Sequence, residues 1–337
     1  MKQRFSVLIL TFIVAIVAVS QGISKKDLEK AEVAAAAQSD GYIKYIDFTP
    51  TSKVMSDCLE VDTSTYKSEN HIGWITLLAL LSSEYYGDFG RYSKSRLDSL
   101  VNEINQNGVE SAIKNRKLYD YYLEAYTAVL GGMVGEYTEV TVSEDGSETR
   151  KDCYGLRVFS PIASGYYYSD YDDFGASRSY GYKRSHLGHD LLGSVGTPII
   201  ATESGYIEHL GWNMYGGWRI GIRSYDGQRY YYYAHLRSGH PYAADLYEGK
   251  QINAGEVIGY LGMTGYSRKE DTNGIDTPHL HYGLQIIFDE SQIDGYNQIW
   301  CDMYALCEFL TKNRAKTYVK DKDRYSRVYY EYPETPD

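Results

Sequence analysis

Cysteine is scarce in this sequence. The 337 residues include four cysteines, far fewer than a small exported domain needs if disulfides are to hold it together, so a disulfide-rich scaffold is excluded. Cys301 and Cys307 fall in a segment that is typical of a helix, and their six-residue spacing places them on different faces, so we expect no bridge between them. Cys58 and Cys153 could join the two halves of the chain, but four cysteines allow several pairings.

Basic charge is also in short supply. The 34 lysines and arginines stand against 45 aspartates and glutamates, which gives a formal net charge of −11. A chain with this balance has no general affinity for phosphate backbones, so we expect no nucleic-acid partner. The hydrophobic fraction of 43% and the charged fraction of 23% are those of a folded protein, and the length suggests about two domains.

Long apolar runs are absent except at the beginning of the chain. Lys2 and Arg4 precede an apolar run from residue 5 to residue 19, which is the layout of a secretory signal. Ala18-Val19-Ser20 offers a cleavage pattern, yet the run is also nearly long enough for a tilted membrane anchor. We therefore expect residues 1–24 to be a signal peptide or a membrane anchor, with the rest of the chain extracytoplasmic and any membrane contact made through this segment alone.

The first half of the chain has the periodicity of helices. Apolar residues recur at spacings of three and four, and Gly108 and Gly131-Gly132 are natural helix stops. We expect a helical region over residues 25–135, and the segments with the clearest pattern are 24–37, 71–87, 96–108 and 118–132.

After Gly135 the texture changes to short, β-rich segments separated by glycines. Asp145-Gly146 and Asp226-Gly227 are hairpin signals. A helix around residues 300–310 closes this half, which we expect to be an antiparallel domain over residues 136–310, followed by a charged C-terminal tail over 311–337. The predicted fold class is α+β, with the antiparallel sheet preceded by a mostly helical region.

Histidine is another rare residue, and its distribution is uneven. All of the eight histidines except His71 fall between His186 and His281. The segment His186-Leu-Gly-His189-Asp190 supplies two imidazoles and a carboxylate within one glycine-containing turn. Histidine and carboxylate sets of this kind suit zinc or another borderline divalent metal.

A second pair of imidazoles occurs at His279 and His281, which share one face if the segment is a strand. Tyr231, Tyr233 and His235 likewise share a parity, so two tyrosines should line a cleft if His235 faces it, although a tyrosine run is also typical of an ordinary strand surface. We expect Tyr231 and Tyr233 to contact substrate.

Tyrosine is abundant, with 37 residues against 8 phenylalanines and 4 tryptophans. Its apolar ring and polar hydroxyl suit half-exposed strands and grooves for polar ligands. Tyr166 to Tyr168, Tyr180 and Tyr182 lie shortly before His186, and we expect them to rim the same cleft.

Five segments occur in a characteristic order: RSHLGHD, GTPIIA, YAHL, INAGEVIGYLGMTGYS and TPHLHYGL. From about residue 159 to residue 285 the chain resembles the lysostaphin and LytM-type family of zinc metallopeptidases (M23), the endopeptidases of bacterial cell walls. The resemblance implies one zinc ion per chain, bound by His186, Asp190 and His281. It also implies that His235 and His279 are catalytic histidines, and leaves open which of them is the base.

Two features depart from the family pattern. The family commonly has Phe-Glu after His-Leu-His, where this chain has Tyr282-Gly283, so contacts on that side of the strand are in question. His189 is additional, and we interpret it as a surface residue, a residue behind the ligands or an alternative ligand. His209 and His240 have no partner motif and are interpreted as structural or surface residues.

The chemistry implied by the resemblance is consistent with these residue types. Three protein ligands leave a zinc position open for water, and zinc lowers the pKa of that water from 15.7 to about 7. No HExxH glutamate is present, so a histidine is the available base. We therefore expect an exported zinc-dependent metalloendopeptidase that hydrolyses peptide bonds in peptidoglycan stem peptides or cross-bridges, secreted to the cell wall or anchored at the membrane.

Three alternatives remain. The first is a catalytically inactive scaffold or partner-binding module at the cell envelope, against which stands the presence of all five site residues. The second reads Glu84 in the helical half as the acid of a glycosidase, but a single carboxylate without a placed partner is a thin basis, and a helical spacer is the simpler interpretation. The third is a glycan-binding protein that uses its tyrosines.

Overall fold

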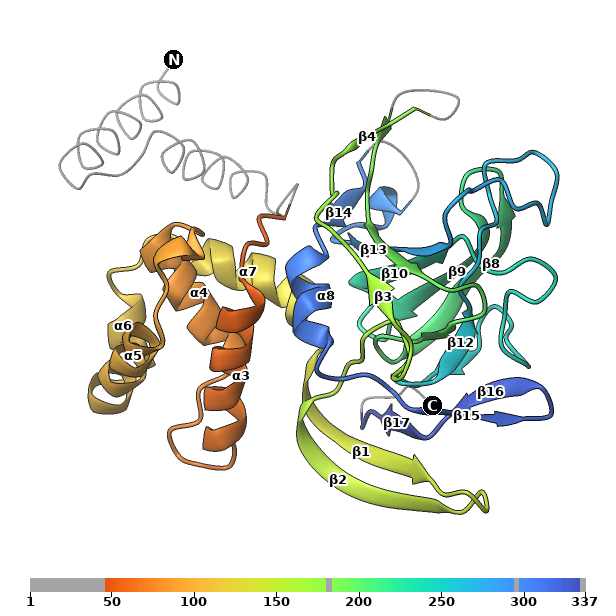
Figure 1. Cartoon of the computed structure of the whole chain (residues 1–337). Coiled ribbons are helices and arrows are strands. Elements are labelled where there is room, and N and C mark those ends of the chain that lie inside the picture. Colours follow the sequence, from red (N-terminus) through yellow and green to blue (C-terminus); the bar gives the residue numbers. More distant parts are fainter. Residues whose placement is uncertain (1–45, 180–183, 294–296, 334–337) are drawn as a thin grey trace.

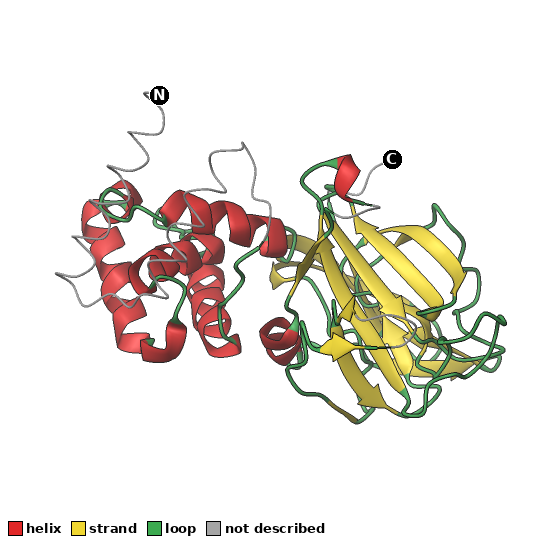
Figure 2. Cartoon of the chain, turned by 90° about the horizontal axis from the view of Figure 1, so that it is seen from above, coloured by secondary structure: helices red, strands yellow, loops and turns green. Residues whose placement is uncertain are grey.

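The computed structural model describes residues 46–179, 184–293 and 297–333. The expected signal or anchor segment, the expected helix over 24–37, Tyr180 and Tyr182 lie outside these ranges. The described chain combines a group of helices with an antiparallel sheet, so the α+β prediction is confirmed (Figure 1). Figure 2 shows the helices gathered on one side and the strands on the other. Within the described ranges no helix has the length and hydropathy needed to cross a membrane.

The helical region contains the three expected helices and two further ones, α3 and the short α6, that the periodicity did not indicate. The longer of the two, α3, begins after Thr51, whose Oγ1 accepts a hydrogen bond from the Val54 backbone N–H. This helix is rich in serine, threonine and aspartate, and its buried apolar stripe, which includes Met55 and Cys58, is too short to stand out in the sequence pattern. The helices are α3 (Ser52–Thr65), α4 (Trp74–Tyr85), the 3-10 turn η1 (Phe89–Arg91), α5 (Lys94–Asn107), α6 (Val109–Ile113) and α7 (Tyr119–Leu130).

Glycine ends α5 as expected. Gly108 has a φ of 80°, and its N–H reaches the Ile104 carbonyl at 2.8 Å. A residue with a Cβ is strained in this left-handed conformation, so glycine allows the chain to leave the helix at once.

Glu84, near the end of α4, is held in an ion pair. Arg96 donates to both of its carboxylate oxygens, at 2.6 Å each. Burial opposes ionisation of Glu84, but the hydrogen bond and charge of Arg96 outweigh it and lower the pKa of the carboxyl. A general acid for glycoside hydrolysis needs a raised pKa, so the glycosidase interpretation of Glu84 is not supported.

The main sheet has the strand order β11-β8-β9-β10-β13-β6-β3, with β14 also paired to β13. Each recorded pairing in it is antiparallel. The Asp226-Gly227 hairpin joins β9 to β10 as predicted. The strands are β3 (Tyr168–Ser169), β6 (His189–Gly193), β8 (Gly205–Asn213), β9 (Gly217–Ser224), β10 (Arg229–Ala234), β11 (Gln251–Ile252), β13 (His279–Ile286) and β14 (Ile299–Cys301).

A smaller sheet includes the C-terminal segment. The strands β1 (Val134–Val142) and β2 (Glu148–Leu156) form a hairpin at Asp145-Gly146, as predicted, and β17 (Val328–Glu331) pairs with the free side of β1. The expectation of a charged tail over 311–337 is therefore wrong for its described part. The remaining strands are β4 (Ser177–Arg178), β5 (Arg184–Ser185), β7 (Pro198–Ile200), β12 (Val257–Tyr260), β15 (Thr317–Lys320) and β16 (Asp323–Ser326), and a second 3-10 turn, η2, spans Glu290–Gln292.

The expected helix around residues 300–310 is shorter than predicted. Helix α8 covers Tyr304–Leu310, while Trp300 and Cys301 lie on β14. In Figure 1, α8 stands between the helical group and the main sheet. Its Phe309 ring stacks on Trp74, with centroids 5.9 Å apart. All four cysteines are free thiols, so no disulfide joins the two halves of the chain. Packing contacts such as the one between Phe309 and Trp74 join them instead.

One face of the main sheet belongs to the core. Leu280, Tyr282 and Leu284 of β13 and Ile220 and Ile222 of β9 have no exposed surface. They belong to one cluster with the interior of the helical region, so the helices and the sheet share a core. Because side chains alternate along a strand, the other residues of these strands face the opposite side, where the candidate site lies.

Candidate metal centre

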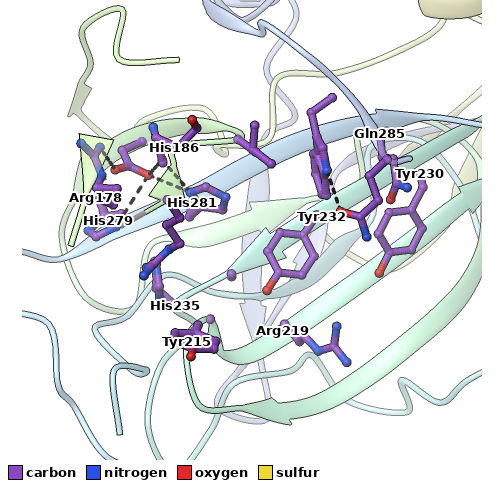
Figure 3. A pocket seen from close by; sticks show the side chains of 18 of the residues that line it. Arg178, His186, Tyr215, Arg219, Tyr230, Tyr232, His235, His279, His281 and Gln285 are labelled. Carbon is purple, nitrogen blue, oxygen red and sulfur yellow. Dashed lines mark hydrogen bonds and ion pairs between the residues drawn. The ribbon is translucent and has the colours of Figure 1, made fainter. Parts of the chain in front are cut away.

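Strand pairing brings three predicted ligands together. In the register of β6 and β13, Asp190 lies directly opposite His281. His186 follows β5, and its Nε2 lies 2.9 Å from His281 Nδ1 and 3.0 Å from Asp190 Oδ1. The distance between His281 Nδ1 and Asp190 Oδ1 is also 3.0 Å. Two imidazoles and one carboxylate therefore present one atom each to a common point (Figure 3).

The donor set fits a zinc ion. His186 Nδ1 lies 3.1 Å from the carboxylate of Asp173, which holds the proton on Nδ1 and leaves the Nε2 lone pair facing the other two ligands. A carboxylate behind a ligand histidine is the usual way in which proteins orient such a ligand. Nitrogen and carboxylate oxygen are both ligands that zinc accepts.

Asp190 is held as an anion. Burial opposes its ionisation, but hydrogen bonds with His186 and His281 outweigh burial and keep its pKa below the usual range. Arg178 reaches its second oxygen, with Nη2 3.2 Å from Oδ2, and also pairs with Asp173 at 2.5 Å. Arg178 therefore bridges the proposed ligand Asp190 and Asp173, the carboxylate that orients the proposed ligand His186. No motif in the sequence indicated this arginine.

The two predicted catalytic histidines lie beside the ligand cluster. His235 and His279 have ring centroids 4.8 Å apart. His235 Nδ1 lies 2.9 Å from the Thr264 carbonyl and His279 Nδ1 lies 2.8 Å from the Thr277 carbonyl. Because a carbonyl can only accept, each Nδ1 carries the proton and each Nε2 is left with a lone pair. The Nε2 of His279 is 3.7 Å from Asp190 Oδ1.

The imidazole of His235 is neutral. Burial, followed by the nearby His279 and His281, lowers its pKa well below the ordinary value of 6.5. The lowered pKa keeps the Nε2 lone pair of His235 unprotonated at neutral pH and thus available to a proton donor.

Close approach at this site requires glycine. A Cβ on Gly188 would lie 2.6 Å from His281 Cε1 and 2.7 Å from His281 Nε2. A Cβ on Gly265, whose φ is 120°, would lie 2.5 Å from the Tyr215 carbonyl oxygen and 3.1 Å from His235 Nδ1. The two glycines let the backbone pack directly against the imidazoles.

The expectation that Tyr231 and Tyr233 line the cleft is wrong. Both side chains have no exposed surface and point into the core, where Tyr231 Oη donates to Glu203 at 2.6 Å and Tyr233 Oη accepts from the Thr202 N–H at 3.0 Å. The parity argument fails because β10 ends before His235.

His235 itself has a φ of 62°. This left-handed conformation turns its side chain away from the alternation of the preceding strand. The cleft is lined instead by the tyrosines of opposite parity, Tyr230 and Tyr232, together with Tyr215 and Tyr266 (Figure 3).

Of the tyrosines before the first proposed ligand, the described Tyr166, Tyr167 and Tyr168 are not part of the cleft lining either. Tyr167 is 83% exposed, and the rings of Tyr166 and Tyr168 lie under the guanidinium groups of Arg324 and Arg314. The expectation that they rim the cleft is therefore wrong for these three.

The remaining histidines divide differently from the expectation. His189 is buried and its Nε2 pairs with Asp170 at 2.8 Å, on the side of β6 away from Asp190, so it is neither a surface residue nor a member of the ligand cluster. His240 pairs with Asp323 and has the expected structural role. His209, however, lines the cleft.

The cleft has a volume of about 580 Å³ and extends from the ligand cluster along the sheet to Gln285 and Trp300. A Cβ on Gly283 would lie 2.7 Å from Cζ3 of Trp300. The glycine that replaces the glutamate of the family pattern therefore makes room for a tryptophan ring, which covers that part of the strand. The structure thus places a different group on this side of the cleft.

The fold and the site define a class of protein. Three candidate ligands, two on the main antiparallel sheet and one just after β5, have two further imidazoles beside them at the end of a cleft. This is the composition of a catalytic metal centre rather than a structural one, which is closed by four protein ligands.

Residues 184–294 match the model of Peptidase family M23, so the chain contains a domain of this family. The L-Ala–D-Glu endopeptidase of Bacillus subtilis is 34% identical over 167 residues, which are 50% of this chain and 47% of that protein. Lysostaphin of Staphylococcus simulans is 37% identical over 98 residues, 29% of this chain and 17% of that protein. The chain thus spans less than half the length of these relatives.

A solved structure shares the fold over a larger part of the chain. It is a LytM protein from Ruminococcus gnavus, with a TM-score of 0.50 and 21% identity over 80% of this chain and 90% of that one. At this identity the likeness concerns the fold alone, and it extends beyond the M23 domain into the rest of the chain.

Proposed function

We propose that this protein is an exported zinc-dependent metalloendopeptidase that hydrolyses peptide bonds in peptidoglycan stem peptides or cross-bridges. The M23 domain and the names of the relatives, which are endopeptidases, support the reaction class. These relatives include an L-Ala–D-Glu endopeptidase, a glycyl-glycine endopeptidase and a peptidoglycan DD-endopeptidase, so their names differ in the bond cut. Peptidoglycan lies outside the cytoplasmic membrane, which agrees with the export expected from residues 1–24.

The single observation that carries the proposal is the convergence of five side chains at one end of a cleft. His186, Asp190 and His281 are the proposed zinc ligands, and their three donor atoms lie within 4.8 Å of one another. Zinc bound there would lower the pKa of a water molecule and polarise the substrate carbonyl.

The two other imidazoles have the chemistry that the reaction needs. Peptide hydrolysis requires one group to move a proton from water to the leaving amine, and another to hydrogen-bond the developing oxyanion. His235 and His279 both have their Nδ1 protons committed to backbone carbonyls, so each ring is fixed in orientation and tautomer. The carbonyl oxygens of Thr264 and Thr277 thus act as positioning groups for the pair.

The experiment that tests the proposal measures metal and turnover separately in the purified chain. We expect about one zinc per chain, loss of zinc to a chelator, and zinc-dependent release of new amino groups from peptidoglycan. His281→Ala should lose the metal, because a zinc ligand is removed. His235→Ala should retain the metal and lose about 100-fold or more in turnover.

Mass spectrometry of the digested peptidoglycan would identify the bond cut. Normal turnover in both variants would reject the assignment of the site. Zinc binding without released amines from any peptidoglycan would favour the second candidate, an inactive scaffold at the envelope. The retention of both non-ligand histidines argues against that candidate, since a scaffold has no use for two oriented imidazoles beside a metal.

A further inference from the structure

The cleft has an arm that the proposed metal chemistry does not use. It is lined by His209 of β8, Arg219 of β9, Tyr230 and Tyr232 of β10, and Gln285 of β13. Figure 3 shows Arg219, Tyr230 and Gln285 on the side of the cleft away from the His186 cluster. The Tyr232 ring links the two parts, because it lies edge-on to His281 with centroids 5.9 Å apart.

Two nitrogen atoms in this arm are buried and lack a hydrogen-bond partner among the described residues. They are Nδ1 of His209 and Nε of Arg219. The two side chains come from adjacent strands, where Gly211 pairs with Arg219 and His209 pairs with Gly221. Buried polar groups in native proteins are nearly always paired, so two unpaired nitrogens in one wall indicate a ligand that supplies the acceptor.

The charge of Arg219 is also uncompensated. Within the described ranges no carboxylate pairs with its guanidinium, whereas Arg223 of the same strand is held by both oxygens of Glu208 at 2.8 Å. Burial raises the pKa of Tyr232, and hydrogen bonds with Asn213 and Arg219 partly offset this. The guanidinium thus contacts a phenol and still has donors to spare.

The whole cleft is cationic, although the chain has a net charge of −11. Its described lining includes Arg184 and Arg219, and its single carboxylate is Asp190. Arg178 also lines it, but its charge is paired with Asp173 and Asp190. The Asp190 carboxylate is already committed to the ligand cluster. A concentration of positive charge in a cleft attracts and orients anionic ligands.

The backbone beside Arg219 is uncovered. A Cβ on its strand neighbour Gly211 would meet nothing within 4 Å. A Cβ on Gly221 would lie 2.0 Å from the Tyr230 hydroxyl, so the absence of a side chain at Gly221 allows the Tyr230 ring to pack against the backbone of β9.

We propose that Arg219 and His209 form a subsite for a carboxylate of the peptide substrate. The inference rests on the proposed endopeptidase function and narrows its substrate class. The protein cleaves a peptide bond next to a residue that carries a free carboxylate, as in an acidic stem peptide. An uncharged glycine bridge offers these donors only neutral carbonyl oxygens and no carboxylate. A planar guanidinium fork is the group best matched to a carboxylate, and His209 Nδ1 adds a second donor when it is protonated or in the suitable tautomer.

The test uses two synthetic peptides of the same acidic sequence, one with a free glutamyl carboxylate near the scissile bond and one with the carboxamide. The full chain, loaded with zinc, should cleave the carboxylate peptide with the higher kcat/KM. Arg219→Gln should lower kcat/KM for that peptide by about 10- to 100-fold, mainly through KM, because a charge-assisted hydrogen bond is lost. The same variant should leave the carboxamide peptide within about 3-fold of the unmodified chain.

Arg219→Lys keeps the charge and loses the planar guanidinium, so its kcat/KM for the carboxylate peptide should lie between those of the unmodified chain and Arg219→Gln. His209→Gln should reduce the same preference. The matched control is Arg150→Gln, which removes an equal charge from an exposed position on β2, where Arg150 pairs with Glu331. It should change neither rate. Zinc content and the melting temperature of each variant check that the metal centre and the fold are intact.

Binding of both peptides to the chelated, zinc-free chain separates this proposal from the proposed function. Preferential binding of the carboxylate peptide that Arg219→Gln abolishes would support the subsite even if no peptide were cleaved. The missing cleavage would then count against the proposed enzymatic function and not against the subsite. Equal cleavage and equal binding of the two peptides would overturn the subsite. So would an equal loss on both peptides in Arg219→Gln.

Discussion

At the scale of single residues, the candidate metal centre depends on a glycine, which has no side chain. Gly188 lies between the proposed ligands His186 and Asp190 in sequence and against the ring of the third proposed ligand, His281, in space. A methyl group there would also lie 3.0 Å from the Tyr282 carbonyl oxygen, so the backbone of β13 restricts any shift that would relieve the clash with His281. The glycine in the histidine motif is therefore a packing requirement of His281.

We expect Gly188→Ala to displace the His281 ring and to weaken zinc binding by about 10- to 100-fold, which is the usual cost of disturbing the support of a ligand. Competition with a chromophoric chelator measures the affinity. Gly73→Ala is the matched control, because its added Cβ would meet nothing within 4 Å. Equal zinc affinity in both variants would contradict the packing argument.

At the scale of elements, the start of β10 is tied to the end of α7. Arg229, 1% exposed, donates to both oxygens of Glu203, at 2.8 Å and 3.0 Å, and to the Ala128 carbonyl at 3.3 Å. Tyr231, two residues further along β10, donates to the same carboxylate. Each buried charge is paired and hydrogen-bonded, which is the condition for tolerating it in a core. This network positions the strand that leads into His235.

Arg229→Met should destabilise the folded chain by about 3–5 kcal/mol, because it leaves the Glu203 carboxylate buried without its partner. Urea unfolding followed by tryptophan fluorescence measures the change. Arg229→Met combined with Glu203→Leu should recover much of the loss, since the unpaired charge is then removed as well. A double variant as unstable as the single one would show that the cost comes from packing rather than from the unpaired charge.

At the scale of the whole molecule, the C-terminal segment completes the fold. Strand β17 pairs with β1, and the ring of Tyr330 lies 4.4 Å from that of Phe159, which precedes the main sheet. The Tyr330 N–H also donates to the Ala254 carbonyl at 2.9 Å. The segment thus connects the β1–β2 hairpin to the M23 domain.

A chain that ends at Lys316 should lose melting temperature and self-associate, because the edge of β1 and the apolar surface around Phe159 become exposed. Thermal unfolding and light scattering measure the two effects. Tyr325→Ser, on the exposed side of β16, is the control and should change the free energy of unfolding by less than about 1 kcal/mol. A truncated chain that is monomeric and as stable as the full one would contradict this role.

Helix periodicity, Asp-Gly turns and the glycine stop at Gly108 were sufficient to predict most local elements, because each depends on residues close in sequence. Helix α3 escaped prediction since its apolar stripe is narrow. Strand β17 escaped because its partner β1 is remote in sequence. Strands β15 and β16 pair with each other, and they escaped because their charged residues suggested a solvated tail.

The sequence by itself supplied the chemical inventory of the candidate site: two imidazoles and a carboxylate as proposed ligands, and two more imidazoles as proposed catalytic groups. Tertiary structure alone decided which side chains share the cleft. Pairing of β6 with β13 sets Asp190 opposite His281 and sends His189 to the other side. The left-handed backbone of His235 puts its side chain in the same cleft as Tyr230 and Tyr232 rather than on the side of Tyr231 and Tyr233. Strand register and the sign of one φ angle arise from contacts between distant segments, so no local pattern contains them.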